Sequence, residues 1–292
     1  MHLINDIDEL LEKYPDKVKN LFQRINLKQE GLEDVRKHVE ASNLIAACNE
    51  LLLYYSTKSP EILPFFQERI GSKQDSSPPS DILKHEFTIN LVKDKVPFTE
   101  GEGLDWNYLG PQQDKEWGWG LNRHGSFKTL LDEWKKTKKD VYVQKANELV
   151  QDWIISNPLP EVYTPSAPWR ALETSLRLTY VWGRLFYEFP TGEMFLPSTK
   201  IMMLFSIWEQ TNHVLKNHVP RGNILIMNLV GILVTCAYFP EFKNAIPSVM
   251  NYSENTDWKE TSISNATKVD QWVDYVLPHL QKEIVDVQVY PD

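Results

Sequence analysis

The sequence is poor in cysteine, has no long uninterrupted hydrophobic run and carries no excess of positive charge. Its two cysteines, Cys48 and Cys236, are too few for a disulfide framework or a zinc site. Because both stand in apolar helical surroundings, we expect buried free thiols. The most apolar stretch, residues 224–239, is short for a bilayer span and is interrupted by Asn228. It predicts a buried core helix and no membrane span.

The cationic residues are outnumbered, because 31 Lys and Arg face 40 Asp and Glu, and the formal net charge is −9. Nucleic-acid binding needs clustered cations on a basic domain, so this balance argues against a nucleic-acid partner. A polyanionic substrate is still compatible with the composition. It requires a local basic or amide-rich cleft on an otherwise acidic body.

Sequence signatures of nucleotide, metal and triad chemistry are also missing. The chain has no Walker loop, no dinucleotide fingerprint and no His-x-x-x-His pair. His213 and His218 stand five residues apart, a spacing that does not bring both onto one helical face. The sequence therefore predicts no metal site and no cofactor.

Helical periodicity is what the sequence has in abundance. Phe127, Leu130 and Trp134 repeat at helical spacing, and alternating strand patterns are nearly absent. We predict an all-α fold of antiparallel helical hairpins. Further helices are expected near residues 3–23, 31–39, 42–57, 146–154, 168–188, 198–217 and 269–287, the last with Pro278 inside it.

Residues 98–120 differ from the rest because they are rich in Gly and Trp and lack a periodic pattern. Long irregular loops inside compact domains are often functional. This segment leads directly into Asn122, Arg123 and His124. The triplet is compatible with a helix cap flanked by solvated neighbours. It is equally compatible with an anion-binding group at a helix start.

Two further polar groups stand in apolar helical surroundings. Glu173 and Arg177 are spaced for an intrahelical salt bridge, although Arg177 can instead point its guanidinium into a central cavity. Asn223 follows a glycine at the start of the run "RGNILIMNLVGILV". It is either an N-cap or an amide held at the edge of a cleft.

Three stretches, "LNRHGSFKTLLDEWKK", "ETSLRLTYVWGRL" and "RGNILIMNLVGILVTCAYFPEF", resemble the N-terminal domain of the heparinase II/III-like polysaccharide lyases. The "QEGLEDVRKHVEASNLIAACNELLLYYSTKS" stretch and the "DWN" at Asp105 are similar to the heparinase III branch. The resemblance covers residues 28–292 and leaves residues 1–27 as an N-terminal helical extension. It implies an incomplete (α/α) toroid of helical hairpins, followed in the family by a β-sandwich domain.

The resemblance implies an enzyme that cleaves uronic-acid-containing polysaccharide, such as heparan-sulfate-like glycosaminoglycan, by β-elimination. Asn223 matches a family asparagine that neutralises the uronate carboxylate beside the scissile linkage. Trp117 or Trp119 would stack on a sugar ring. The implied partner is an acidic polysaccharide, and the implied location is periplasmic or extracellular. The residues expected to line its anionic subsites are Asn122, Arg123, His124 and Arg177.

The sequence departs from the family pattern in two places. Ile224 stands where relatives commonly carry His or Trp after the asparagine. The chain closes on "QVYPD", where Tyr290 resembles a tyrosine that precedes the segment with the catalytic Tyr-His phrase. We therefore expect a chain truncated before its base and its β-sandwich, without an export signal, and inactive by itself.

Two other functions are compatible with the residues. A non-catalytic carbohydrate-binding or scaffold domain would keep the cleft without the base. A glycoside hydrolase would need a pair of carboxylates, and Glu102 and Asp105 are close in sequence without any further mark of such a pair.

Overall fold

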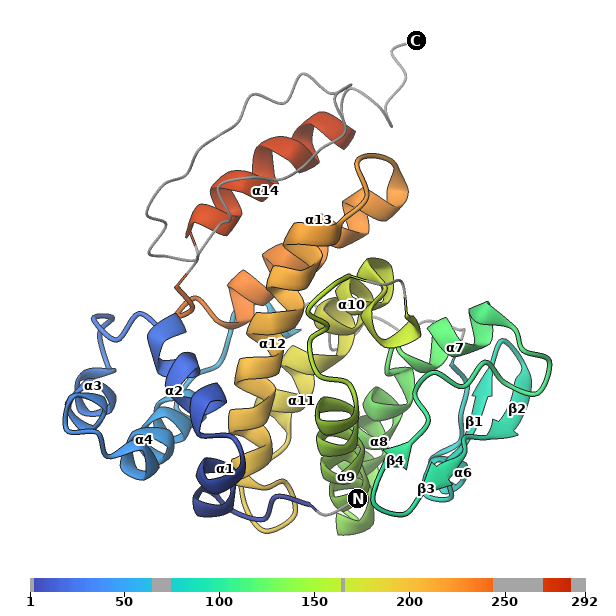
Figure 1. Ribbon diagram of the computed structural model, residues 1–292, viewed down its shortest axis with the longest axis horizontal. Coiled ribbons are helices and arrows are strands. Elements are labelled where there is room, and N and C mark those ends of the chain that lie inside the picture. The colour runs from blue at the N-terminus through green and yellow to red at the C-terminus, as the bar shows by residue number, and fades with distance from the viewer. Residues whose placement is uncertain (1–2, 65–74, 164–165, 244–269, 285–292) are drawn as a thin grey trace.

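The computed structural model describes residues 3–64, 75–163, 166–243 and 270–284 (Figure 1). This part is mostly helical, and each of its two sheets is a two-stranded antiparallel hairpin. The prediction of a helical fold without a larger sheet is thereby confirmed for the described residues. Tyr290 lies outside them.

The N-terminal helices pack against the long helices in the middle of the fold (Figure 1). The single helix expected over residues 3–23 is two helices, because Pro15 starts a new one after Tyr14. This part contains α1 (Ile7–Lys13), α2 (Pro15–Arg24), α3 (Glu33–Glu40) and α4 (Leu44–Ser56). The short α6 (Pro79–Ile82) lies apart from these helices, beside the strands (Figure 1).

Residues 86–121 form the two hairpins and one helix. The segment 98–120, expected to be irregular, contains regular elements too short to show a sequence period. They are fastened to the core, because Asp152 accepts hydrogen bonds from the indole Nε1 of Trp106 (2.7 Å) and from the amide of Leu104 (3.2 Å). The elements are β1 (Glu86–Ile89), β2 (Val92–Lys95), β3 (Phe98–Thr99), β4 (Gly103–Leu104) and α7 (Lys115–Leu121).

The helix expected over residues 168–188 consists of segments of different helical types, and the backbone is extended at Arg170 between the first two (φ −63°, ψ 129°). A 3-10 turn precedes an α-helix, and a π-helical turn then widens the backbone before the next α-helix. Such π turns occur often at functional sites. The elements of this middle part are α8 (Gly125–Thr137), α9 (Asp140–Ser156), η1 (Ala167–Trp169), α10 (Ala171–Arg177), η2 (Leu178–Trp182) and α11 (Gly183–Glu188).

Helices α12 (Pro197–Asn217), α13 (Asn223–Tyr238) and α14 (Asp270–Lys282) complete the described fold. The chain reverses between α12 and α13, which pack against each other, and α13 also contacts α10 and α14 (Figure 1). As predicted for a core helix, α13 buries half of its apolar residues, and of the others only Ala237 is exposed. None of the described helices combines the length and the apolar character that a membrane crossing needs.

Buried contacts join the N-terminal helices to the end of α13. Glu241 accepts hydrogen bonds from the hydroxyls of Tyr54 (2.7 Å) and Tyr55 (3.2 Å) on α4. Ile25 forms an isolated antiparallel bridge with Phe242. Both cysteines are free and buried, as expected. Residues up to 27 thus share the core with later helices, and their separation as an extension stays a prediction.

The β3–β4 hairpin offers a matched pair of glycines for testing its packing. Gly101 and Gly103 both have positive φ (88° and 96°). A Cβ on Gly103 would lie 2.0 Å from Oδ1 of Asp152, whereas a Cβ on Gly101 meets nothing within 4 Å. Both alanine variants pay the backbone strain.

We predict that Gly103→Ala lowers the free energy of unfolding by about 1–3 kcal/mol more than Gly101→Ala, because only the former overpacks a buried site. Urea denaturation followed by circular dichroism measures the difference. Equal losses in the two variants would show that the hairpin is not fixed to Asp152 as described.

Candidate functional site

A cluster of cationic and aromatic side chains lies where α7 and its following turn meet the start of α10. Glu173 is wholly buried, and its Oε1 accepts hydrogen bonds from Nη2 of Arg123 (2.9 Å) and Nη1 of Arg170 (2.8 Å). The guanidinium of Arg170 stands over the ring of Trp119, 3.8 Å from its centre. We call Trp119, Arg123, Arg170 and Glu173 the α7–α10 cluster.

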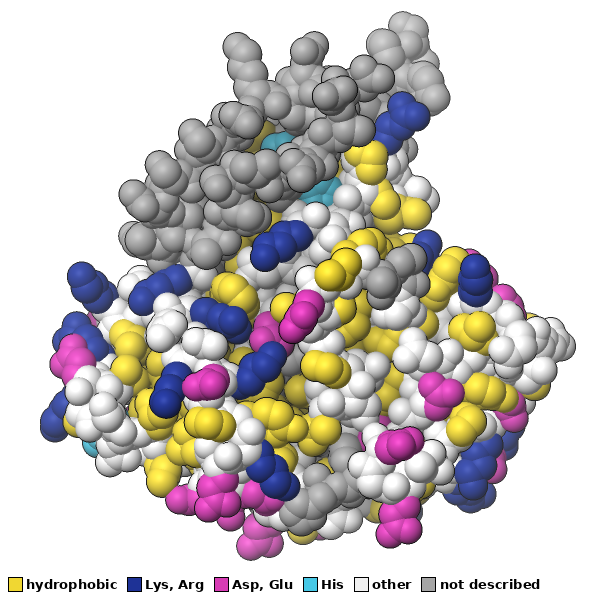
Figure 2. Space-filling model, viewed as in Figure 1, with side chains coloured by type: hydrophobic (Ala, Val, Ile, Leu, Met, Phe, Trp, Pro, Cys, Tyr) yellow, Lys and Arg dark blue, Asp and Glu magenta, His cyan; other side chains and the backbone are white. Residues whose placement is uncertain are grey.

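The surface around the α7–α10 cluster carries charges of both signs. In the described part of the face shown in Figure 2, Lys and Arg side chains are interspersed with Asp and Glu. An anion would therefore be held by a local arrangement of donors.

Asn122 is buried rather than placed at a surface. It is the C-cap residue of α7, and its Nδ2 donates to the carbonyls of Trp106 (2.8 Å) and Gly118 (2.9 Å). Its Oδ1 accepts from the indole of Trp153 (3.2 Å). With all its polar groups engaged in packing, Asn122 has no direct contact to offer a ligand in this structure.

His124 is also wholly buried, in a left-handed backbone conformation (φ 60°) at the N-cap of α8. Its Nδ1 accepts from the indole of Trp182 (2.9 Å), and its ring stacks on Phe127. Burial, and then the charge of Arg177, hold its pKa well below the ordinary histidine value. A neutral imidazole in this position supports packing and adds no charge to the site.

Arg177 does point into the interior, and the alternative of an intrahelical bridge to Glu173 is not what the structure contains. Its Nε donates to Gln210 (2.6 Å), its Nη1 to the carbonyl of Asn122 (3.3 Å), and its guanidinium lies 4.3 Å from the ring centre of Trp153. Burial lowers its pKa to about 9, against the opposing charge of Glu173. Arg177 therefore stays mostly protonated near neutral pH.

The two candidate stacking residues differ. Trp117 is buried, and its indole donates to the carbonyl of Val92 (3.0 Å), so it holds α7 on the β1–β2 hairpin. Trp119 is partly exposed and belongs to the α7–α10 cluster. Of the two, only Trp119 has a surface for a sugar ring.

Asn223 is the first residue of α13, and its side chain is exposed. The cap position belongs to Gly222, whose φ of 88° is readily available only to glycine and whose amide donates to Oε1 of Glu283 (2.5 Å). The helix has no side-chain cap, so the N-cap alternative for Asn223 does not hold. The amide of Asn223 stands at a helix N-terminus, where anions are favoured.

Helix α10 connects the α7–α10 cluster to α13. Two residues beyond Glu173, the hydroxyl of Ser175 accepts from Nδ2 of Asn228 on α13 (2.9 Å). A Cβ on Gly231 would lie 2.9 Å from the Cα of Ser175, so the two helices approach closely. Asn228 is little more than one turn from Asn223. The predicted surface shared by Arg123 and Asn223 stays a prediction.

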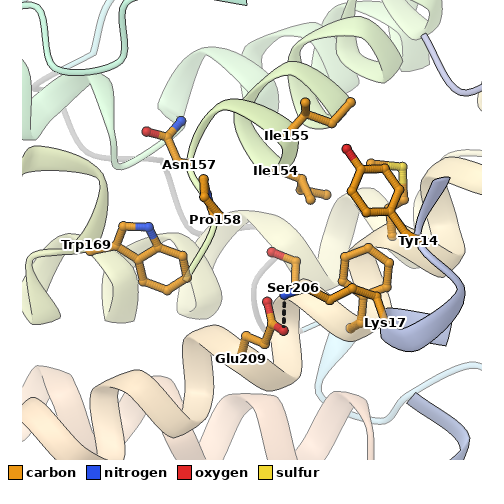
Figure 3. A pocket seen from close by; sticks show the side chains of 11 residues that line it. Tyr14, Lys17, Ile154, Ile155, Asn157, Pro158, Trp169, Ser206 and Glu209 are labelled. Atoms are coloured by element: carbon orange, nitrogen blue, oxygen red, sulfur yellow. Dashed lines mark hydrogen bonds and ion pairs between the residues drawn. The ribbon is translucent and has the colours of Figure 1, made fainter. Parts of the chain in front are cut away.

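A small cavity lies between residues of α2, α9 and α12 (Figure 3). Apolar residues of α9 and α12 line it together with Trp169, and Lys17 and Glu209 close it with an ion pair of 2.5 Å. Its volume of about 60 Å³ corresponds to roughly two water molecules. None of the predicted site residues lines it.

The remaining polar candidates have structural partners. His213 is buried and contacts the carbonyl of Trp169 (2.6 Å), while His218 lies near Tyr275 (3.1 Å). Within the described residues, no group of His, Cys, Asp and Glu is arranged to hold a metal ion. The carboxylate of Asp105 accepts from the amide of Asn107 (3.0 Å), a turn interaction. Glu102 is exposed in the β3–β4 turn.

A family model described as Heparinase II/III N-terminus matches residues 21–264. The chain belongs to this family. Among its relatives is a heparin-sulfate lyase of Bacteroides thetaiotaomicron, 27% identical over 252 residues, with 82% of this chain and 36% of the relative covered. A heparin-sulfate lyase of Pedobacter heparinus is 26% identical over 250 residues, covering 83% of this chain and 36% of the relative.

Solved structures agree with this assignment at the level of the fold. A heparinase III with methylated lysines matches with a TM-score of 0.75 at 23% identity, covering 94% of this chain and 41% of that one. The heparan sulfate lyase of Pedobacter heparinus matches with a TM-score of 0.69 at 23% identity, covering 94% and 40%. The chain thus spans little more than a third of the length of its heparin-sulfate lyase relatives.

Sequence reasoning missed Arg170. It stands directly before the periodic stretch of α10, and only its distance of three residues from Glu173 hinted at an ion pair. Arg170 and Trp119 are far apart in the chain, so no local sequence pattern predicts their contact.

The buried His213 yields a pH prediction. Burial lowers its pKa from 6.5 to about 4, outweighing the bond to the Trp169 carbonyl. Between these values the unfolded chain binds a proton that the folded chain does not, so the free energy of unfolding falls as the pH falls from 6.5 to 4. We predict that His213→Gln removes this contribution, up to about 3 kcal/mol.

Denaturation curves at several pH values measure the contribution of His213 to the free energy of unfolding. His38→Gln on α3 is the matched histidine control. Other titrating groups are common to all three proteins and cancel in the comparison. Parallel pH profiles for wild type and His213→Gln would contradict the assignment.

Proposed function

We propose that this chain is the N-terminal part of a lyase that cleaves heparan sulfate, or a related uronic-acid polysaccharide, by β-elimination. The support is family membership and similarity, over about four fifths of the chain, to proteins named heparin-sulfate lyase. Under this proposal the helices form an incomplete (α/α) toroid. A periplasmic or extracellular location stays a prediction from the resemblance.

The proposal assigns Asn223 the task of neutralising the uronate carboxylate. The C5 proton of a uronate is a poor acid, and removing it builds negative charge on the neighbouring carboxylate. Donors aimed at that charge stabilise the transition state. The exposed amide of Asn223, the first residue of α13, is the observation that carries this assignment. The proton itself must go to a base that we do not assign.

The other predicted residues divide into contact and positioning roles. Arg123 and Trp119 are partly exposed and are proposed to contact substrate. Asn122, His124 and Arg177 are buried, and we propose that they position α7, α8 and α10. Trp117 has the same supporting role through its bond to the hairpin.

We predict that the 292-residue chain binds heparan sulfate oligosaccharides weakly and does not cleave them. Binding follows from the exposed donors. Cleavage also needs a base, whose assistance is typically worth about 10²–10⁴-fold, and this chain matches only about a third of the lyases that it resembles. Calorimetry measures the binding, and the ultraviolet absorbance of the unsaturated uronate measures cleavage. Efficient product formation by this chain would contradict the proposal that it is only the N-terminal part of a lyase.

A chimera tests the activity directly. This chain replaces the matching N-terminal part of the Bacteroides thetaiotaomicron lyase, and we predict β-elimination of heparan sulfate by the product. Asn223→Ala in the chimera should lower turnover by about 10²–10³-fold, the scale of one lost donor to a developing oxyanion.

Asn20→Ala on α2 is the matched control and should leave turnover unchanged. An Asn223→Ala chimera as fast as its parent would contradict the role of Asn223. A folded chimera that binds heparan sulfate without cleaving it would instead favour the non-catalytic carbohydrate-binding domain.

A further inference from the structure

The α7–α10 cluster holds more positive charge than its carboxylate balances. Glu173 is the one acid that forms ion pairs with Arg123 and Arg170 among the described residues, and each arginine carries a full charge. Because Glu173 is wholly buried while both arginines are partly exposed, the surplus charge lies on the solvent side.

Arg170 has donors to spare. Its Nη1 alone makes the bonds to Glu173, at 2.8 Å to each carboxylate oxygen. Its Nε and Nη2 have no partner among the described residues, and 24% of the side chain is exposed. A guanidinium presents its donors in a planar fork that matches carboxylate and sulfate oxygens.

The aromatic neighbours of Arg170 fix its place. Trp119 stands beneath its guanidinium at 3.8 Å from the ring centre, and such stacking limits the rotamers open to the arginine. The exposed Tyr163 lies close enough for the charges of Arg170 and Glu173 to act on its hydroxyl. A ring surface beside an oriented cation suits a pyranose that carries an anionic group.

We propose that Arg170 contacts substrate directly, and that Arg170 and Trp119, oriented by the buried carboxylate of Glu173, form a subsite for a sugar ring bearing a sulfate or a carboxylate. This inference rests on the proposed function, since it presumes an acidic saccharide ligand. Glu173 acts as the positioning residue, because it holds both arginines without reaching solvent itself.

A purely structural ion pair that fastens α7 to α10 is the competing explanation. It predicts that altering Arg170 changes stability but leaves the affinity of the folded protein unchanged. Affinity must therefore be measured together with thermal unfolding. Arg170→Lys separates the two explanations best, because lysine keeps the charge beside Glu173 but lacks the planar fork.

The experiment uses the 292-residue chain and three octasaccharides: heparan sulfate, unsulfated heparosan and neutral chitin-derived sugar. Calorimetry at fixed low salt compares wild type with Arg170→Gln, Arg170→Lys and Trp119→Leu. Arg36→Gln on α3, far from the cluster in Figure 1, is the matched control with the same loss of charge.

We expect Arg170→Gln to weaken heparan sulfate binding by about tenfold to a hundredfold, the worth of hydrogen bonds to a charged group. Arg170→Lys and Trp119→Leu should each lose a smaller, measurable part, and Arg36→Gln should bind as wild type. A loss confined to heparan sulfate identifies a sulfate in the subsite, and an equal loss on heparosan identifies the carboxylate.

Wild-type affinity in folded Arg170→Lys and Trp119→Leu would overturn the subsite and leave the proposed function standing. Absence of binding by the wild-type chain to either acidic octasaccharide would overturn both. Equal binding of the neutral sugar would show that the subsite does not recognise an anion.

Discussion

The buried guanidinium of Arg177 is the charge on which the arrangement of the central helices depends. Among the described residues no carboxylate forms an ion pair with it; Gln210 on α12, the carbonyl of Asn122 and the face of Trp153 on α9 surround it instead. An unsupported buried cation is costly by several kcal/mol. The end of α7, α9, α10 and α12 must therefore keep positions from which all of these groups reach Arg177.

The same constraint also positions the charged residues at the start of α10. Helix α10 carries Arg177 toward the interior and, one turn earlier, Glu173 toward Arg123 and Arg170. The same helix packs closely on α13, whose first residue is Asn223. Because α10 is fixed in this way, the positions of the α7–α10 cluster and of α13, which carries Asn223, are fixed as well. The groups proposed to bind substrate therefore depend on buried polar interactions of α10.

Sequence reasoning reached the helical elements because their apolar patterns are long: a stripe at helical spacing in α8 and a nearly continuous apolar run in α13. It failed at the hairpins, which are too short for an alternating pattern, and at Asn122. A polar residue beside Arg and His reads as a surface group, but its amide bonds the carbonyl of Trp106 sixteen residues earlier. Arg170 was missed for the same reason, because its contact with Trp119 is tertiary. The position of Asn223 at the start of α13 could be predicted, because a Gly-Asn pair opens the apolar run.

The α7–α10 cluster and the start of α13 are proposed to bind an acidic saccharide. Nuclear magnetic resonance of the chain titrated with a heparan sulfate octasaccharide tests this proposal most directly. We expect the indole signal of Trp119 and the side-chain amide of Asn223 to shift together with increasing ligand, while the buried indole of Trp117 shifts little. Shifts centred on α3 and α4, with Trp119 and Asn223 unmoved, would contradict it.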